Sequence, residues 1–135
     1  MVDEDFKKLY KKAKEITGKT RLNEFVKYGH VGAALMTDKG NIYTGVAITC
    51  ACQIGFCAEH SAISEMLKNN ESRITKIVAT SSNVPVPPCG RCREFIRMVN
   101  NENMDTEVMI SEDSIVKLKD LLPHAWTLET FDKNN

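Results

Sequence analysis

At 135 residues, with 42% hydrophobic and 27% charged side chains, the chain is long enough for one buried core, and its composition excludes a disordered or fibrous protein. Eighteen basic and eighteen acidic side chains cancel, which excludes the bulk positive field of a nucleic-acid-binding or membrane-surface protein and favours a small ligand of low charge. The first residues are acidic and no stretch reaches membrane-spanning length, so the sequence predicts a cytoplasmic protein without a membrane partner.

The first 48 residues predict one helix and one hairpin. Apolar side chains recur at helical spacing from Phe6 to Ile16, and Gly18 follows where a helix end favours a left-handed residue. Apolar runs at residues 31–37 and 42–48 are separated by Asp, Lys, Gly and Asn, which favour a turn. Two antiparallel strands are expected there.

The rest of the chain alternates helices with strands. One helical stripe begins close to Cys57 and another near Gly90. Three segments have the composition of strands: residues 74–81, 108–110 and 115–118. The prolines from Pro85 to Pro88 forbid continuation of the first of these, and residues 121–123 are expected to end a short helical turn. This alternation predicts an α/β fold, a sandwich in which helices cover a mixed sheet, as a single domain over residues 1–135.

Three of the five cysteines form a candidate metal site. In a reducing compartment, clustered cysteines are more often metal ligands or catalytic thiols than disulfides. Cys57, Cys89 and Cys92 lie at loop-to-helix junctions, where backbone donors and the helix dipole stabilise thiolates. Three thiolates leave the fourth tetrahedral position of zinc to water, and Glu59 is spaced to act as the base that this water needs. A structural zinc site or plain buried thiols are the alternative interpretation.

Two motifs carry a resemblance to a known family. Cys-Ala-Glu at residues 57–59 and Pro-Cys-Gly-Arg-Cys-Arg at residues 88–93 resemble the signature of the cytidine deaminase superfamily. The similarity extends over residues 31–126 and is closest to the small three-cysteine branch, which includes cytidine and blasticidin S deaminases.

The resemblance implies a fold, a cofactor and a reaction. It implies a three-layer sandwich with a mixed, about five-stranded sheet, Zn²⁺ held by the three cysteines, and a homotetramer or homodimer. The implied activity is hydrolytic deamination of an aminated pyrimidine-type heterocycle or nucleoside analogue, with release of ammonia and with Glu59 moving the protons. A nucleic-acid editing deaminase and a non-catalytic zinc-binding module are the alternatives.

The sequence departs from the family where the substrate is gripped. Cytidine deaminases carry Asn-x-Glu, which holds the ribose hydroxyls, and the matching residues here are Ala47 and Thr49. Blasticidin S deaminases keep the asparagine, so they match only in part. Ala47, Thr49 and Ala58 are assigned to the substrate pocket, and the loss of the polar partners disfavours cytidine itself. Lys27 and Gly29 replace a serine and a phenylalanine of the family, which reshapes the pocket.

Two further residues receive roles by resemblance. His60 stands where many relatives have an arginine beside the thiolates, and a protonated His60 is predicted to tune the metal site. Trp126 stands where the family often has an aromatic that closes an active site, including that of a neighbouring subunit; burial in the core is the alternative. Arg91 and Arg93 are expected to orient the cysteine loop or to pair with acids.

The remaining cysteines and histidines receive no catalytic role. Cys50 and Cys52 form a pair without a nearby histidine, which is a weak metal motif, so they are expected in the pocket wall or the core. His30 and His124 are isolated in the sequence and are interpreted as ordinary structural or surface residues.

Overall fold

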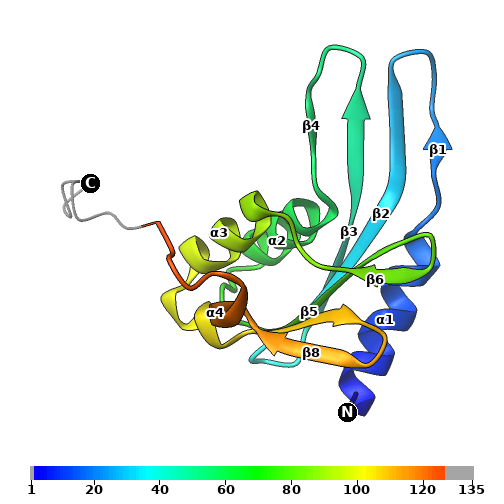
Figure 1. Cartoon of the computed structure of the whole chain (residues 1–135). Coiled ribbons are helices and arrows are strands. Elements are labelled where there is room, and N and C mark those ends of the chain that lie inside the picture. The colour runs from blue at the N-terminus through cyan, green and yellow to red at the C-terminus, as the bar shows by residue number, and fades with distance from the viewer. Residues whose placement is uncertain (1, 127–135) are drawn as a thin grey trace.

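Helices cover both faces of a single mixed sheet in the computed structural model, which describes residues 2–126 (Figure 1). The helices are α1 (Glu4–Ile16), α2 (Ala58–Lys68), α3 (Gly90–Val99), the 3-10 helix η1 (Asn101–Asp105) and α4 (Leu118–Leu121). The strands are β1 (Thr20–Arg21), β2 (Val26–Thr37), β3 (Ile42–Cys50), β4 (Gly55–Phe56), β5 (Ile74–Ser81), β6 (Val84–Val86), β7 (Glu107–Ser111) and β8 (Ser114–Lys117).

The sheet runs in the order β4-β3-β2-β5-β7-β8, with β1 added beside β2 and β6 beside β5. Within residues 2–126, only the β5–β7 pair is parallel; the other pairs are antiparallel. Among the described residues, β1, β4 and β6 are only two or three residues long, which leaves five longer strands. The predicted α/β sandwich with a mixed, about five-stranded sheet is therefore confirmed.

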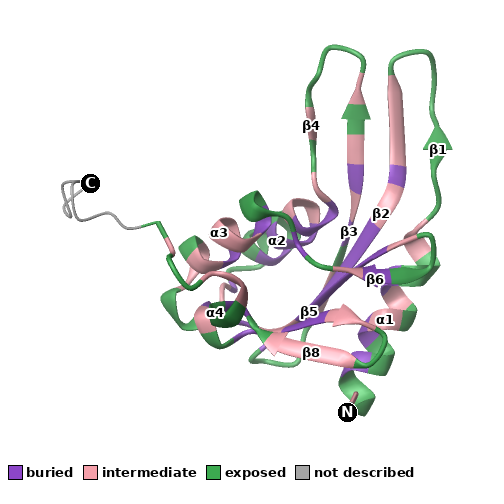
Figure 2. Ribbon diagram, in the orientation of Figure 1, coloured by how far each residue is buried: buried purple, intermediate pink, exposed green. Residues whose placement is uncertain are grey.

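The two faces of the sheet bury different helices because successive strand residues point to opposite sides. Ala34 of β2 faces α1, where it packs with Phe6 and Leu9 in one apolar cluster. Its neighbour Leu35 faces the other way and packs in a second cluster with Ile63 of α2 and other residues of α2 and α3. Figure 2 shows this burial concentrated in the lower halves of β2, β3 and β5. The result is the three-layer arrangement that the resemblance implies.

The helices and strands predicted for the core are confirmed, but the sequence missed a strand at the edge of the sheet. The strand expected at residues 74–81 and the helices expected near Cys57 and Gly90 are present as β5, α2 and α3. The prolines end β5 as expected, but Pro85 itself lies in β6, a short strand that the sequence did not predict. An edge strand tolerates a proline because one side of its backbone has no ladder to complete.

The hairpin strands are longer than the sequence predicts, and they form two arms. With β1 and β4, the added parts of β2 and β3 project beyond the helices (Figure 1). The β2–β3 ladder continues to the pair Val26 and Cys50, and the backbone N–H of Ala51 donates to the carbonyl of Phe25 over 2.8 Å. The outer parts of the arms are mostly exposed (Figure 2). Because no apolar core covers them, their sequence lacks the alternation that marks a half-buried strand.

Asn103 stabilises the junction between β5, α3 and η1, and its replacement provides a test of the fold. Its completely buried amide donates to the carbonyls of Ser72 (3.0 Å) and Ile96 (2.9 Å) and accepts from the Ile74 amide (2.8 Å). Asn103→Leu removes these bonds and leaves buried backbone groups without partners, so we expect the free energy of unfolding to fall by about 2–4 kcal/mol in urea titrations. The exposed neighbour Asn101→Leu serves as the control, and an equal loss in both variants would contradict this role.

Candidate active site

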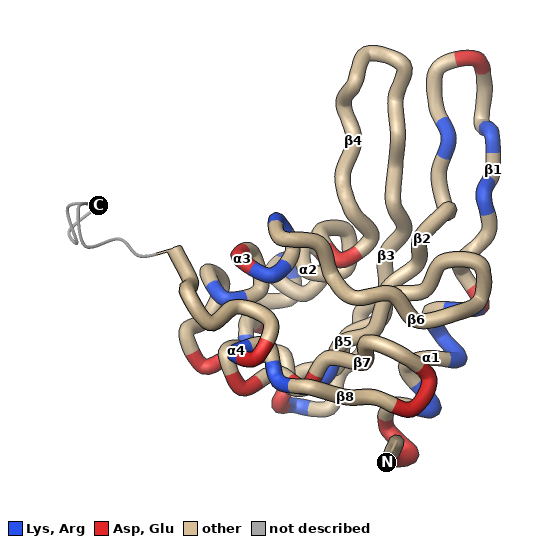
Figure 3. The backbone as a smooth tube through the Cα atoms, in the orientation of Figure 1, with Lys and Arg blue, Asp and Glu red and all other residues tan. Residues whose placement is uncertain are grey.

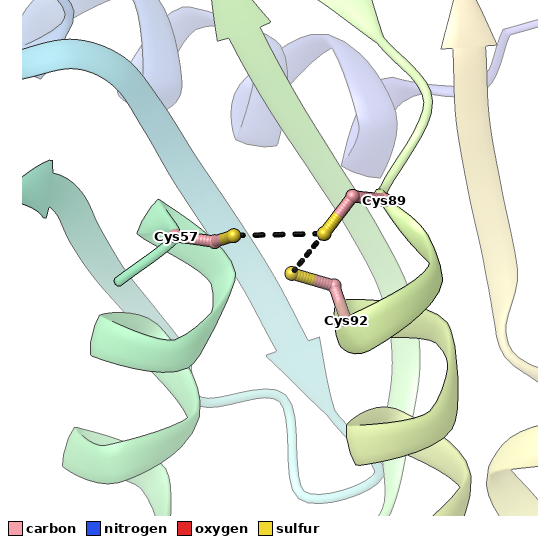
Figure 4. Close-up of side chains that lie close together, drawn as sticks. All are labelled: Cys57, Cys89 and Cys92. Carbon is pink, nitrogen blue, oxygen red and sulfur yellow. Dashed lines mark hydrogen bonds between the residues drawn. The ribbon is translucent and has the colours of Figure 1, made fainter. Parts of the chain in front are cut away.

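The N-termini of α2 and α3 bring three thiols together (Figure 4). Cys57 is the N-cap of α2, Cys89 is the N-cap of α3, and Cys92 lies in the first turn of α3. Neither N-cap side chain is used to cap its own helix, so both sulfurs are available to a ligand. The Sγ atom of Cys89 lies 3.6 Å from that of Cys57 and 3.6 Å from that of Cys92.

The spacing of these sulfurs fits tetrahedral zinc. Zn–S bonds of about 2.3 Å at tetrahedral angles separate the sulfurs by about 3.8 Å. All three Sγ atoms lie within 4.8 Å of one another, and the cysteines are free thiols rather than disulfides. Three ligands from the protein leave a fourth position for the substrate or water, which is typical of catalytic rather than structural zinc sites.

The acidities of the thiols also suit a bound cation. Burial and the neighbouring Glu59 raise the pKa of Cys92 well above its usual range. Burial and the hydrogen bond with Cys89 raise the pKa of Cys57. Burial opposes ionisation of Cys89 as well, but hydrogen bonds from the Cys92 amide and from the other two thiols outweigh it, so the pKa of Cys89 is lowered. A divalent cation supplies the positive charge that three adjacent thiolates require.

Glu59 lies beside this cluster, inside the pocket. It belongs to the first turn of α2 and is only 5% exposed. Burial raises the pKa of Glu59 above its usual value, although hydrogen bonds to its own backbone and to Cys92 oppose the shift. A carboxyl group whose pKa is raised toward neutrality accepts and returns protons efficiently, which suits a general acid–base role.

Gly45 of β3 sets the distance between the sheet and the helix that carries this carboxylate. A Cβ atom at Gly45 would lie 2.7 Å from the Ala58 carbonyl oxygen and nearer still to the Ala62 backbone nitrogen. Only a glycine allows the backbone of α2 to approach so closely. We expect Gly45→Ala to push α2 outward, lowering the free energy of unfolding by about 1–3 kcal/mol and weakening zinc retention. Gly90→Ala, where a Cβ meets no atom within 4 Å, is the matched control, and unchanged stability in Gly45→Ala would contradict the argument.

A pocket of about 430 Å³ opens over the cluster, within the size range of small-molecule sites. Cys57, Glu59 and Cys89 are among its lining residues. The other lining residues come from β2, from β3 and β4 with their connecting turn, from the α2 start and from the β6–α3 segment: His30, Val31, Ala47, Ile48, Thr49, Gln53, Ile54, Gly55, Phe56, Ala58, Val86, Pro87 and Arg91. The pocket therefore joins the metal cluster to the base of the two arms.

The structure places the predicted substrate positions in this pocket and adds one that the sequence did not predict. Ala47, Thr49 and Ala58 all line it, and Ala47 and Ala58 are buried. Opposite Ala47 the β2–β3 ladder has a bulge, where residues 29–31 oppose this single residue. The bulge brings His30 to the pocket, with its Nε2 atom 3.5 Å from Thr49 Oγ1.

The sequence assigns no role to His30, whereas the structure places it in the lining of the pocket. Its only sequence signal is that it immediately precedes the apolar run at residue 31, on the strand that pairs with Ala47. A bulge breaks the two-residue alternation of a strand, so the direction of a side chain inside it cannot be predicted from periodicity.

His60 and Trp126 lie outside the pocket. The His60 ring packs edge-on against Phe95, with ring centroids 5.0 Å apart, and burial followed by the charge of Arg91 lowers the pKa of His60. This favours the neutral ring, whereas the tuning hypothesis requires the protonated one. Trp126 is 49% exposed, and its backbone N–H donates to Glu94 Oε2 over 2.9 Å. Closure of a neighbouring subunit's site by Trp126 stays a prediction.

Arg93 orients the cysteine loop, as the sequence suggested. Its Nε atom donates to the Pro88 carbonyl (2.8 Å) and its guanidinium donates to the Leu121 carbonyl of α4 (3.1 Å). Cys50 and Cys52 lie at the end of β3 and in the following turn, and neither joins the thiol cluster among the described residues.

Comparison with known proteins agrees with this geometry. The sequence model of the cytidine and deoxycytidylate deaminase zinc-binding region matches residues 3–107. The chain is 32% identical over 120 residues to a cytidine deaminase from Sporosarcina psychrophila, which covers 82% of this chain and 86% of the relative. A cytidine deaminase from Histophilus somni is 33% identical over 108 residues, 77% of this chain but only 33% of that longer relative.

Two other similarities concern a shorter part of the sequence and the fold. A blasticidin-S deaminase from Bacillus cereus is 38% identical over 77 residues, 50% of this chain and 55% of the relative. The fold is similar to the crystal structure of cytidine deaminase from Mycobacterium tuberculosis, with a TM-score of 0.77 and 23% identity over 93% of this chain and 100% of that one. Family match, fold and thiol cluster agree: the chain belongs to the family of zinc-binding cytidine and deoxycytidylate deaminases, which are hydrolytic deaminases.

Proposed function

We propose that this protein hydrolytically deaminates a small aminated pyrimidine-type heterocycle or nucleoside analogue of the cytidine or blasticidin S class and releases ammonia. The observation that carries the proposal is that Glu59 lines one pocket together with Cys57 and Cys89, two members of the three-thiol cluster. Much of the remaining wall is apolar or small, so an aromatic heterocycle can be desolvated beside the only carboxylate among the lining residues.

The residues of the pocket have distinct tasks in this reaction. Cys57, Cys89 and Cys92 would hold zinc, which when bound would supply Lewis acidity toward the attacking water. Glu59 takes one proton from this water as the new C–O bond forms and delivers it to the ring nitrogen. Glu59 then takes the proton of the newly added hydroxyl group and delivers it to the exocyclic amine, whose C–N bond breaks, so that ammonia leaves and a carbonyl remains. Ala58 lies beside this carboxylate in the pocket wall.

The proposal leaves the exact substrate undefined, because Ala47 and Thr49 stand where cytidine deaminases carry the polar Asn and Glu. Neither side chain can reproduce a bidentate grip on two ribose hydroxyls, since alanine has no polar side-chain atom and threonine has one. A site that lacks such partners discriminates weakly in favour of the hydroxyl-bearing substrate. We therefore expect the turnover of cytidine to be modest.

Ammonia release tests the proposal directly. The zinc-loaded full chain is assayed with cytosine, cytidine, deoxycytidine and blasticidin S, and at least one compound is expected to release ammonia faster than it does with the Glu59→Gln variant. A zinc-loaded protein that releases no ammonia from any of these compounds, and none from their phosphorylated forms, would assign the chain to non-catalytic zinc modules.

We also propose that the protein is a cytoplasmic homotetramer or homodimer. A shallow hollow on α2 and α3, lined by residues that include His60, Phe95 and Met98, supports association, because Met98 is 49% exposed and His60 Nε2 is buried without a hydrogen-bond partner among residues 2–126. No helix in this part of the chain is long and apolar enough to cross a membrane. Light scattering of the purified protein and fractionation of the producing cells test the two statements.

A further inference from the structure

A second hollow on the β1–β2 arm adjoins the substrate pocket. This adjoining hollow, of about 330 Å³, shares Thr49 and Gln53 with the pocket. Its other lining residues come from the arm and from the turn after β3: Arg21, Glu24, Phe25, Lys27, Cys50 and Ala51. Thr49 and Gln53 therefore lie between the pocket that contains Glu59 and the hollow on the arm, and a substituent extending past Thr49 would reach this second hollow.

Strand register places two cations on the wall of this hollow. Thr49 of β3 lies directly opposite Lys27 of β2, and Lys27 lies directly opposite Arg21 of β1. Residues that face each other across an antiparallel ladder project their side chains to the same face of the sheet. Ala47, two residues before Thr49 on the same strand, shares that face and lines the pocket. One row therefore leads from the pocket to Lys27 and then to Arg21.

The charges along this path are mostly positive. Neither Lys27 nor Arg21 forms an ion pair within residues 2–126. Arg91 adds another cation at the pocket wall, and Glu24 is the one acid that lines the adjoining hollow. Figure 3 shows basic residues on both strands of the β1–β2 arm and an acidic residue at its tip. The zero net charge of the whole chain conceals this local excess.

We infer that the substrate carries an anionic substituent, a phosphate or a carboxylate, remote from the reacting amino group, and that Lys27 and Arg21 bind this substituent. The inference rests on the proposed deaminase function and narrows its substrate class. It replaces the ribose-hydroxyl grip that Ala47 and Thr49 lack with a charge contact from β2 and β1 on the same face of the sheet. It also contradicts the expectation of a low-charge ligand that the overall composition favours.

The test compares substrates that differ only in charge. Cytidine, cytidine 5′-monophosphate and cytidine 5′-carboxylate are offered to the zinc-loaded full chain, and the ratio of kcat/KM for each anion to that for cytidine is measured. At low salt we expect a ratio of about ten or more for at least one anion, and we expect it to fall as ionic strength rises because salt screens exposed charges. Comparison of the phosphate and carboxylate compounds identifies which anion the site binds.

Variants test whether Lys27 and Arg21 bind the anionic substituent. Lys27→Ala and Arg21→Ala are each expected to lower the anion-to-cytidine ratio several-fold, and the double variant is expected to abolish the preference. Lys19→Ala is the matched control, because Lys19 is exposed beside β1 but lines neither hollow. The same ratio is measured for equilibrium binding by calorimetry, so the test does not depend on turnover.

Each contrary outcome has a distinct meaning. Equal binding and turnover of cytidine and both anions, or a preference that Lys27→Ala and Arg21→Ala leave intact, overturns the anionic substituent but not the deaminase activity. Faster deamination of a cytosine-containing single-stranded oligonucleotide than of the mononucleotide overturns the small substrate in favour of a nucleic acid. Ammonia release from neither anions nor neutral compounds overturns the proposed function itself.

Discussion

Replacing Glu59 with glutamine is expected to lower kcat for the best substrate about a thousandfold, within the range of about 10²–10⁴ that general acid–base catalysis contributes. Glutamine keeps the size of the side chain and most of its hydrogen bonds, but it cannot accept and return a proton at neutral pH. The measurement is ammonia release under saturating substrate, combined with zinc content by atomic absorption. We expect zinc to remain bound, because Glu59 is not one of the three thiol ligands.

Glu65→Gln is the matched control for this experiment. Glu65 lies on the same helix, is exposed, pairs with Lys68 and is absent from the pocket lining, so this variant should keep normal turnover. If Glu59→Gln retains more than about a tenth of wild-type kcat with zinc bound, another group moves the protons and the proposed mechanism is wrong.

Replacing Cys92 with alanine is expected to remove both zinc and activity. Cys92 is completely buried, with its sulfur 3.6 Å from that of Cys89, so loss of this sulfur leaves only two protein ligands. Two thiolates hold zinc far more weakly than three, and we expect the purified variant to contain less than about a tenth of an equivalent. Ammonia release should fall to the level of the uncatalysed reaction.

A chelator experiment separates metal loss from unfolding. Zinc that binds only the folded state raises the melting temperature, so a chelator should lower this temperature for the wild type and leave that of Cys92→Ala unchanged. Cys52→Ala is the control, because Cys52 is exposed and lies outside the cluster. A Cys92→Ala variant that keeps a full equivalent of zinc would show that the metal lies elsewhere.

The core of the fold is predictable because apolar side chains recur at short, regular spacing within each core helix and strand. The α1 helix buries one apolar stripe, and the apolar run of β5 is buried against its neighbours. The spacing of apolar residues in the sequence follows this burial directly. Pro85 correctly indicates the end of β5, but it gives no sign that the chain returns as β6. An edge strand depends on a neighbour that completes its ladder, and no local pattern encodes that neighbour.

The metal cluster is predictable for a related reason. Cys57 and Glu59 are held by one helix start, and Cys89 and Cys92 by another, so local spacing determines how each pair is presented. The spacing of these motifs therefore indicates the chemistry by itself. It does not reveal that Gly45 must lack a side chain for α2 to lie against β3, because that contact joins separate elements.

The sequence by itself determined the chemistry of this protein: three thiols, one carboxylate and the helices that present them, all set by residues close together in the chain. Only the tertiary structure decided what surrounds the substrate. The bulge that brings His30 to Thr49, and the register that places Lys27 opposite Thr49 and Arg21 opposite Lys27, arise from pairing between separate strands. A register shift of one residue would turn these side chains to the other face, so their role could not be predicted from composition or spacing.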